Sequence, residues 1–126
     1  GNTHIIQEFY DPRFDLLNHI TDKTVVISIA FARYTKWTYR YADSAKKMGA
    51  TLVSITDSVS SPFFNISHYT ILAAPVKDSM GFSSPICMYC LFDAIISKIH
   101  DERKDMIVER LKQYEDTYRD FDMYYE

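Results

Sequence analysis

The chain has 126 residues, of which 47% are hydrophobic and 25% charged, and its formal net charge is −3. This length and composition favour one soluble globular domain that can bury a core without disulfides or a structural metal. The acidic balance argues against a nucleic-acid-binding domain, and no apolar run approaches the roughly 18 residues of a membrane span. Two cysteines are too few for a disulfide framework, so we expect a cytoplasmic protein.

In the first half of the chain, short apolar segments alternate with helical patterns. We expect a short strand over 3–9 and a helix over 11–20. The run TVVISIAF at 24–31 is rich in β-branched residues and predicts a strand that is covered on both faces. Residues 35–49 predict a helix that Gly49 can end. One face of this helix carries Trp37, Tyr41, Ala45 and Met48.

The second half of the chain continues this alternation. In chain order, the patterns predict a strand at 51–57, a short helix at 60–67, a strand at 69–75, a loop at 76–84 and a long helix over about 85–122. Strands that alternate with helices favour an α/β fold with a parallel sheet. Ligands of such sheets bind beyond the carboxyl ends of the strands, near helix N-termini. We therefore expect the site at the loops that follow the strands.

The long helix changes character along its length, because residues 86–96 are apolar nearly all round and predict burial on several sides. Further on, apolar residues recur in a heptad-like stripe, which packs either on its own domain or on a partner chain as well. The stripe consists of Ile107, Leu111, Tyr114, Tyr118, Phe121 and Tyr125. We expect a homodimer or a higher oligomer. The residues expected at or near its contact are Ile95, Ile99, Ile107 and Leu111.

Three short motifs occur in a fixed order: KKMGA at 46–50, ITDS at 55–58 and SP at 61–62. Together with the buried strand before them, they resemble the SIS (sugar isomerase) domain in the version found in RpiR-type bacterial transcriptional regulators. The resemblance covers roughly residues 3 to 100. It implies a three-layer α/β/α fold of the flavodoxin or Rossmann-like kind, built on a parallel sheet, with a site for a phosphorylated sugar.

The resemblance places the phosphate loop of the family on residues 30–35, where the family typically reads Ser-x-Ser-Gly-x-Thr. Ala30 and Ala32 stand at the two serine positions, Arg33 stands at the glycine position, and Thr35 matches the family. Two missing hydroxyls remove about 1–3 kcal/mol of hydrogen bonding to a charged ligand. Arg33 could compensate with a bidentate grip on phosphate. We therefore expect weak binding of a phosphosugar.

Four further residues are candidates for contact with the ligand. Asp57 and Ser58 end a strand on the same side as the phosphate loop, and Ser83 and Ser84 precede the long helix. Each candidate has a plain structural alternative: Asp57 can bond local backbone in a turn, and Ser84 can cap the helix.

The sequence assembles no catalytic or metal centre, and we expect no cofactor. Glu8, Asp57 and His68 are the only acid or base candidates near the expected site, and none has a convincing partner. Cys87 and Cys90 lie in an apolar run, so we expect them in the core rather than in a redox or zinc site.

The resembled family usually opens with a strand, a turn containing Gly and Ser, and a helix, whereas this chain begins at what would be the next strand. We therefore expect a fragment, and the start Gly1-Asn2 favours the same interpretation. The resemblance implies an effector-sensing and dimerisation domain of an RpiR-type regulator, which contacts DNA only through a helix-turn-helix domain outside this chain. The alternatives are a phosphosugar isomerase and a degenerate SIS domain that serves dimerisation only.

Overall fold

The computed structural model describes residues 3–6, 14–77, 79–80, 83–84 and 86–120. The chain divides into two compact units, residues 1–87 and 88–126, and each is described by itself. The elements of unit 1 are η1 (Phe14–His19), β1 (Val25–Ala30), α1 (Lys36–Lys47), β2 (Thr51–Thr56), α2 (Pro62–Ile66), β3 (Tyr69–Leu72), β4 (Val76–Lys77) and β5 (Ser83–Ser84).

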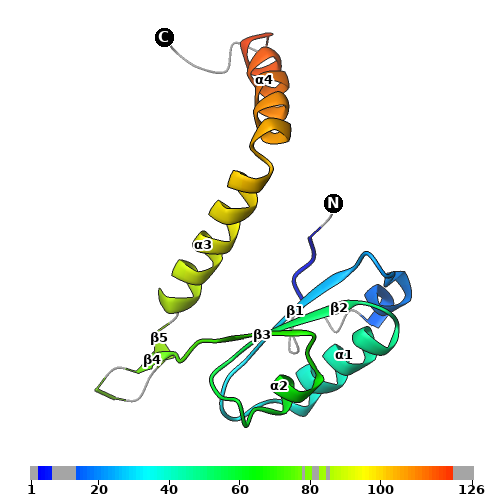
Figure 1. Ribbon diagram of the computed structural model, residues 1–126, viewed down its shortest axis with the longest axis vertical. Helices are drawn as coiled ribbons and strands as arrows, with labels where there is room; N and C mark the ends of the chain where they lie inside the picture. Colours follow the sequence, from blue (N-terminus) through cyan, green and yellow to red (C-terminus); the bar gives the residue numbers. More distant parts are fainter. Residues whose placement is uncertain (1–2, 7–13, 78, 81–82, 85, 121–126) are drawn as a thin grey trace. The chain divides into compact units, whose positions relative to one another are not determined.

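A three-stranded parallel sheet in the order β1-β2-β3 forms the centre of unit 1 (Figure 1). The predicted alternation of strands and helices is therefore confirmed, and the fold is α/β. Helix α1 begins after Thr35, whose side chain accepts a hydrogen bond from the Thr38 N–H. It ends as the sequence predicts, because Gly49 follows the last turn with a φ of 107°, a conformation that favours glycine.

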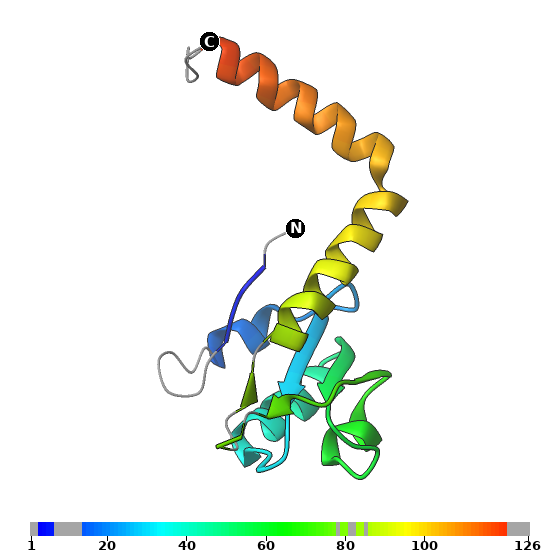
Figure 2. The ribbon, with the colours of Figure 1, turned by 90° about the vertical axis from the view of Figure 1, so that its left-hand side faces the viewer.

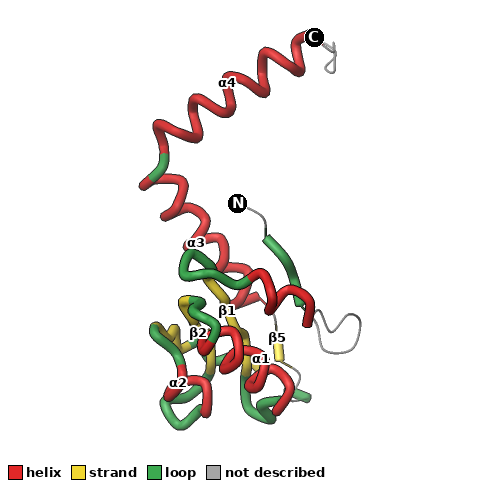
Figure 3. The backbone as a smooth tube through the Cα atoms, turned by 90° about the vertical axis from the view of Figure 1, so that its right-hand side faces the viewer, coloured by secondary structure: helices red, strands yellow, loops and turns green. Residues whose placement is uncertain are grey.

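Helices α1 and α2 cover one face of the sheet (Figure 3). The core between these layers is formed by Ala30, Ala42, Leu52 and Phe63, with Val26, Tyr34, Tyr39 and Ile66 packed around it. Leu52 and Phe63 are fully buried, and each such side chain contributes about 1.5–3 kcal/mol relative to exposure.

The other face of the sheet is apolar and exposed. On β1 it carries Val25, Ile27 and Ile29, whose exposed fractions are 60%, 47% and 42%. The sequence predicted that this strand is covered on both faces, but the described residues of unit 1 do not form a second covering layer.

Serine and threonine hydroxyls pair across the buried side of the sheet. The Ser28 and Ser54 hydroxyl oxygens are 2.6 Å apart, and Ser67 lies next to both Ser54 and the carbonyl oxygen of Phe63. Among the described residues, every buried side-chain nitrogen and oxygen has a hydrogen-bond partner. Ser54 is the central member of this chain of hydroxyls, so its loss affects groups on β1 and after α2.

Replacing Ser54 with Ala should destabilise unit 1 by about 1–3 kcal/mol, because the Ser28 and Ser67 hydroxyls each lose a partner inside the protein. Urea denaturation measures this loss as a lower free energy of unfolding. Ser60→Ala is the matched control, since Ser60 is exposed and its loss should change the free energy by less than about 0.5 kcal/mol. Equal stability of the two variants would show that the hydroxyl chain contributes nothing.

Some local predictions differ from the structure. Residues 3–6 form no strand, and the remainder of the segment 3–9 lies outside the described residues. A 3-10 helix, η1, replaces most of the α-helix predicted over 11–20, of which residues 11–13 also lie outside. The predicted loop at 76–84 contains β4 and β5, which pair as antiparallel strands with Val76 opposite Ser84.

Two helices follow, α3 (Ile86–Glu102) and α4 (Lys104–Asp120), where the sequence predicted one helix over about 85–122 (Figure 2). They are interrupted at Arg103, whose N–H lies within hydrogen-bond distance of both the Ile99 and His100 carbonyl oxygens. No Pro or Gly lies between 86 and 120, so nothing in the sequence marks this interruption. No described helix is long and apolar enough to cross a membrane.

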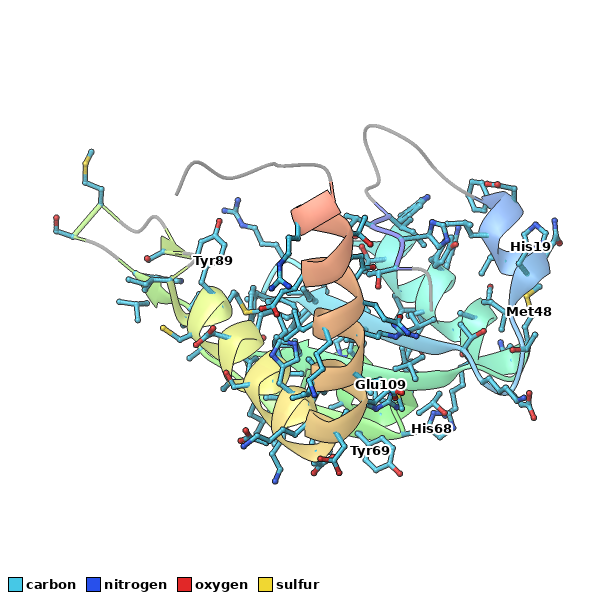
Figure 4. All side chains as sticks on the ribbon, turned by 90° about the horizontal axis from the view of Figure 1, so that it is seen from above. His19, Met48, His68, Tyr69, Tyr89 and Glu109 are labelled. Carbon is cyan, nitrogen blue, oxygen red and sulfur yellow. The ribbon has the colours of Figure 1, made fainter. Side chains whose placement is uncertain are left out.

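No described residue of α3 is buried, although its sequence is apolar nearly all round. Tyr89, labelled in Figure 4, is among its most exposed side chains. The expectation of a cysteine pair in the core is also not met, because Cys90 is exposed and Cys87 is half-buried. Of the residues expected at a contact, Ile95 and Ile107 are half-buried, while Ile99 and Leu111 have exposed fractions of 48% and 54%.

Candidate functional site

Two loops meet at the carboxyl edge of the parallel sheet. Residues 31–35 connect β1 to α1, and residues 57–61 connect β2 to α2. The two loops start side by side because Ala30 pairs with Thr56 at the ends of their strands. This is the edge at which open α/β sheets bind their ligands.

The carboxylate of Asp57 ties the two loops together. One oxygen, Oδ2, accepts the Ala32 N–H at 2.9 Å, and the other, Oδ1, accepts the Tyr34 hydroxyl at 2.6 Å. The Thr56 hydroxyl lies 3.5 Å from Oδ1. The sequence left open a role for Asp57 in a local turn, whereas its bonds reach across to the neighbouring loop.

These bonds change the acidity of both partners. Burial acts to raise the pKa of Asp57, but the hydrogen bonds from the Tyr34 hydroxyl and the Ala32 N–H favour the charged form and hold the pKa below its usual value. The pKa of Tyr34 is raised, first by its hydrogen bond to the Asp57 carboxylate and then by burial. Asp57 is therefore ionised, and Tyr34 protonated, at neutral pH.

The link between the loops should weaken in acid. Since the pKa of Asp57 is lower in the folded state, its contribution to stability is present above the unfolded value of about 3.9 and is lost as the pH falls through the folded value. Tyr34→Phe removes one donor to the carboxylate, so its free energy of unfolding should fall less than that of the unmodified chain between pH 7 and pH 3.

Urea titrations at several pH values measure this difference. Tyr39→Phe is the control, because Tyr39 also packs on Phe63 but does not bond Asp57. Parallel pH curves for the Tyr34→Phe variant and the unmodified chain would contradict the assignment.

Arg33 lies between the two donors to Asp57 and has a φ of 75°. This left-handed conformation costs a residue with a side chain roughly 1–2 kcal/mol and is natural for glycine. Position 33 is the one at which the SIS resemblance expects glycine. Arg33 thus adopts the left-handed conformation although it is not a glycine. The hydrogen bonds that the Ala32 N–H and the Tyr34 hydroxyl donate to Asp57 hold this conformation in place.

Arg33→Gly should raise the free energy of unfolding by about 1 kcal/mol, because the strain at this position disappears, although glycine loses more backbone entropy on folding. Arg40→Gly is the matched control: Arg40 lies inside α1, where glycine costs about 1 kcal/mol. Thermal denaturation of both variants shows whether each substitution raises or lowers the stability of the fold. A loss of stability in Arg33→Gly would mean that the arginine side chain itself stabilises the loop.

A shallow pocket of about 290 Å³ lies beside the first turns of α1. It is lined by Tyr34, Thr35, Lys36, Tyr39, Arg40 and Pro62. The first turn of α1 has no acidic residue, so its positive end is not neutralised there. Among the described residues, neither Lys36 nor Arg40 forms an ion pair. The pocket therefore offers positive charge to an anion and two tyrosine rings to an apolar or sugar surface.

Sequence reasoning identified Thr35 but missed the rest of this pocket. Thr35 caps α1, and its hydroxyl oxygen is 2.6 Å from that of Thr38. Lys36 and Arg40 lie on successive turns of the helix, so helical spacing from Thr35 was the signal that could have found them. Pro62 is the first residue of α2, which follows the other loop, and only the sheet pairing places it nearby.

The remaining predicted residues are not all brought together. Ala30 is buried in the core, while Ala32 and Arg33 are exposed in the loop. Ser58 bonds Ser60 at 2.8 Å within its own turn. Ser83 and Ser84 form β5. The Ser84 hydroxyl accepts the Ile86 N–H at 3.3 Å, as the side chain of a helix cap does, whereas the side chain of Ser83 is not described. No described hydrogen bond joins Ser84 to the first loop.

Other candidate groups take structural roles or fall outside the structure. His68, which directly precedes β3 (Figure 4), accepts the Leu52 N–H on its Nδ1 atom at 2.9 Å and so extends the pairing of β2 with β3. Glu8 lies outside the described residues. Within the described part of the chain, no three His, Cys, Asp or Glu residues gather closely enough to hold a metal ion.

The sequence matches the model of one protein family, and the fold matches a solved structure. The SIS domain family matches residues 1–98. The crystal structure of the RpiR transcription factor from Sphaerobacter thermophilus (sugar isomerase domain) matches with a TM-score of 0.70 and 19% sequence identity, over 80% of this chain and 56% of that chain. This chain thus spans just over half of the length of that structure. No curated protein shows significant similarity to the sequence.

Proposed function

Because this chain belongs to the SIS domain family, we propose that it is the effector-sensing and dimerising domain of an RpiR-type transcriptional regulator and binds a phosphorylated sugar weakly. The fold that it shares with the RpiR transcription factor from Sphaerobacter thermophilus supports a regulator. In this proposal the domain is cytoplasmic, pairs with a second copy and contacts DNA only through a separate helix-turn-helix domain.

The observation that carries the proposal is the positive charge at the carboxyl edge of the sheet. Arg33 and Lys36 flank the start of α1, whose first turn is free of acidic residues. A phosphate group at a helix N-terminus is stabilised by the helix dipole and by such cations. The rings of Tyr34 and Tyr39 supply the apolar contact that a sugar ring needs beside its phosphate.

Two features of the same edge predict that the affinity is low. Ala30 and Ala32 provide no hydroxyl to a phosphate, which removes about 1–3 kcal/mol. In addition, the Ala32 N–H is already bonded to the Asp57 carboxylate, so one backbone donor of the loop is occupied. A loss of 1.4 kcal/mol is a tenfold loss in affinity, and we therefore expect dissociation constants well above 1 μM.

An isomerase is disfavoured by the acid-base groups of the site. Sugar isomerisation needs a group that exchanges a proton near neutral pH. Asp57 is the only described carboxylate bonded within the two loops, and its lowered pKa and two hydrogen bonds make it a poor base. The geometry therefore supports binding rather than turnover.

Titration with hexose and amino-sugar phosphates, followed by calorimetry or amide NMR shifts, tests the binding proposal. Arg33→Ala and Lys36→Ala should each weaken binding several-fold, since each removes a positive charge beside the N-terminus of α1. Lys23→Ala is the control, because Lys23 precedes β1 and lies toward the opposite edge of the sheet.

Sub-micromolar binding that survives both substitutions would contradict the assigned site. If no sugar phosphate binds, the remaining alternative is a degenerate SIS domain that serves dimerisation only. Conversion of the added sugar phosphate at more than a few turnovers per second would instead support the isomerase.

A further inference from the structure

Helix α4 carries an apolar stripe that faces solvent. Ile107 is half-buried, while Leu111 and Tyr114 have exposed fractions of 54% and 58%. Their spacing of four and then three residues places them on one side of the helix. The helix begins at Lys104, beyond residue 98, where the match to the SIS domain family ends. The stripe is therefore an addition to the family domain.

The spacing assigns heptad positions along α4. Ile107 and Tyr114 take position d and Leu111 takes position a. The same spacing recurs in the sequence at 118, 121 and 125, of which 121 and 125 lie outside the described residues. On the flanks of the seam, this register assigns Arg110 to position g and Glu115 to the following position e.

The two flanking charges determine which way a pair of such helices runs. In a parallel pair, position g of one helix faces the following position e of its partner, so Arg110 meets Glu115 on both sides of the seam. An antiparallel pair sets g against g and e against e, which brings like charges toward each other. Neither Arg110 nor Glu115 has an ion-pair partner among the described residues of its own chain.

From this pattern we infer that α4 pairs with α4 of a second copy as a parallel, in-register, two-stranded coiled coil with Ile107 and Leu111 in its seam. The inference rests on the proposed dimerisation, but not on the binding of an effector. Most of the stability of a helix in a protein comes from the packing of its apolar face, so the coil is expected in the whole chain and not in an isolated peptide of these 17 residues.

A cross-linking experiment tests the pairing. With Cys87 and Cys90 both replaced by Ser, Leu111→Cys places a single thiol at position a, where the two copies face each other in a parallel coil. Mild oxidation should convert most of the chain to a disulfide-linked dimer on a non-reducing gel. Glu109→Cys in the same background is the control (Figure 4 labels Glu109), because position f points away from the seam and should give little cross-linking.

Charge reversal tests the direction of the pair. In the Leu111→Cys chain, Arg110→Glu or Glu115→Arg alone should slow cross-linking roughly fivefold, since each sets two like-charged pairs against each other. The double exchange should restore the original rate. Lys112→Glu, at position b, should leave it unchanged.

Each outcome separates this inference from the proposed function. A dimer in sedimentation that fails to cross-link through residue 111 would overturn the coil and leave dimerisation standing. A monomer at micromolar concentration would overturn the coil and the proposed dimer, while effector binding would be judged by its own titration. Cross-linking without rescue by the double exchange would overturn the parallel register.

Discussion

The carboxyl edge of the sheet depends on one carboxylate that is shared between two loops. Asp57 follows β2, yet both of its oxygens accept hydrogen bonds from the loop after β1. This reach is available only because β1 and β2 run parallel and end together, with Ala30 opposite Thr56. The left-handed turn at Arg33 lies between the two donors of that link, and α1 with the pocket beside it begins directly after them. A shift of the strand register would separate these groups, and the site would be lost.

Much of the fold could be predicted from local patterns. The β-branched run before residue 31 predicted β1, and the pattern over 35–49 predicted α1. These predictions succeed because helix caps and hydrophobic periodicity depend on residues that are neighbours in the sequence. The interruption at Arg103 could not be predicted in this way, since no helix-breaking residue marks it. The short strands β4 and β5 have only two residues each, too few for an alternating pattern to be visible.

The candidate site was harder to predict than the elements that hold it. Thr35 and Asp57 were identified because they end strands or begin helices. The bond from Tyr34 to Asp57 joins residues from separate loops, and no local pattern encodes such a contact. The SIS resemblance located the loop, but of its four characteristic positions this chain matches only Thr35. In this chain, position 33 has a left-handed backbone conformation that favours glycine, and the hydrogen bonds to Asp57 hold the loop on either side of it.

The exposed face of β1 also bears on how the chain stays in solution. The segment VVISIA has high β-propensity and no charge, which is the composition that forms intermolecular sheets and aggregates. Asp22 and Lys23 precede it, and Arg33 follows it closely. Charged residues that flank such a segment act as gatekeepers, because they make the stacking of identical strands unfavourable. Arg33 therefore occupies a gatekeeper position and a strained backbone position at once, and a glycine there would relieve the strain but remove the charge that follows the segment.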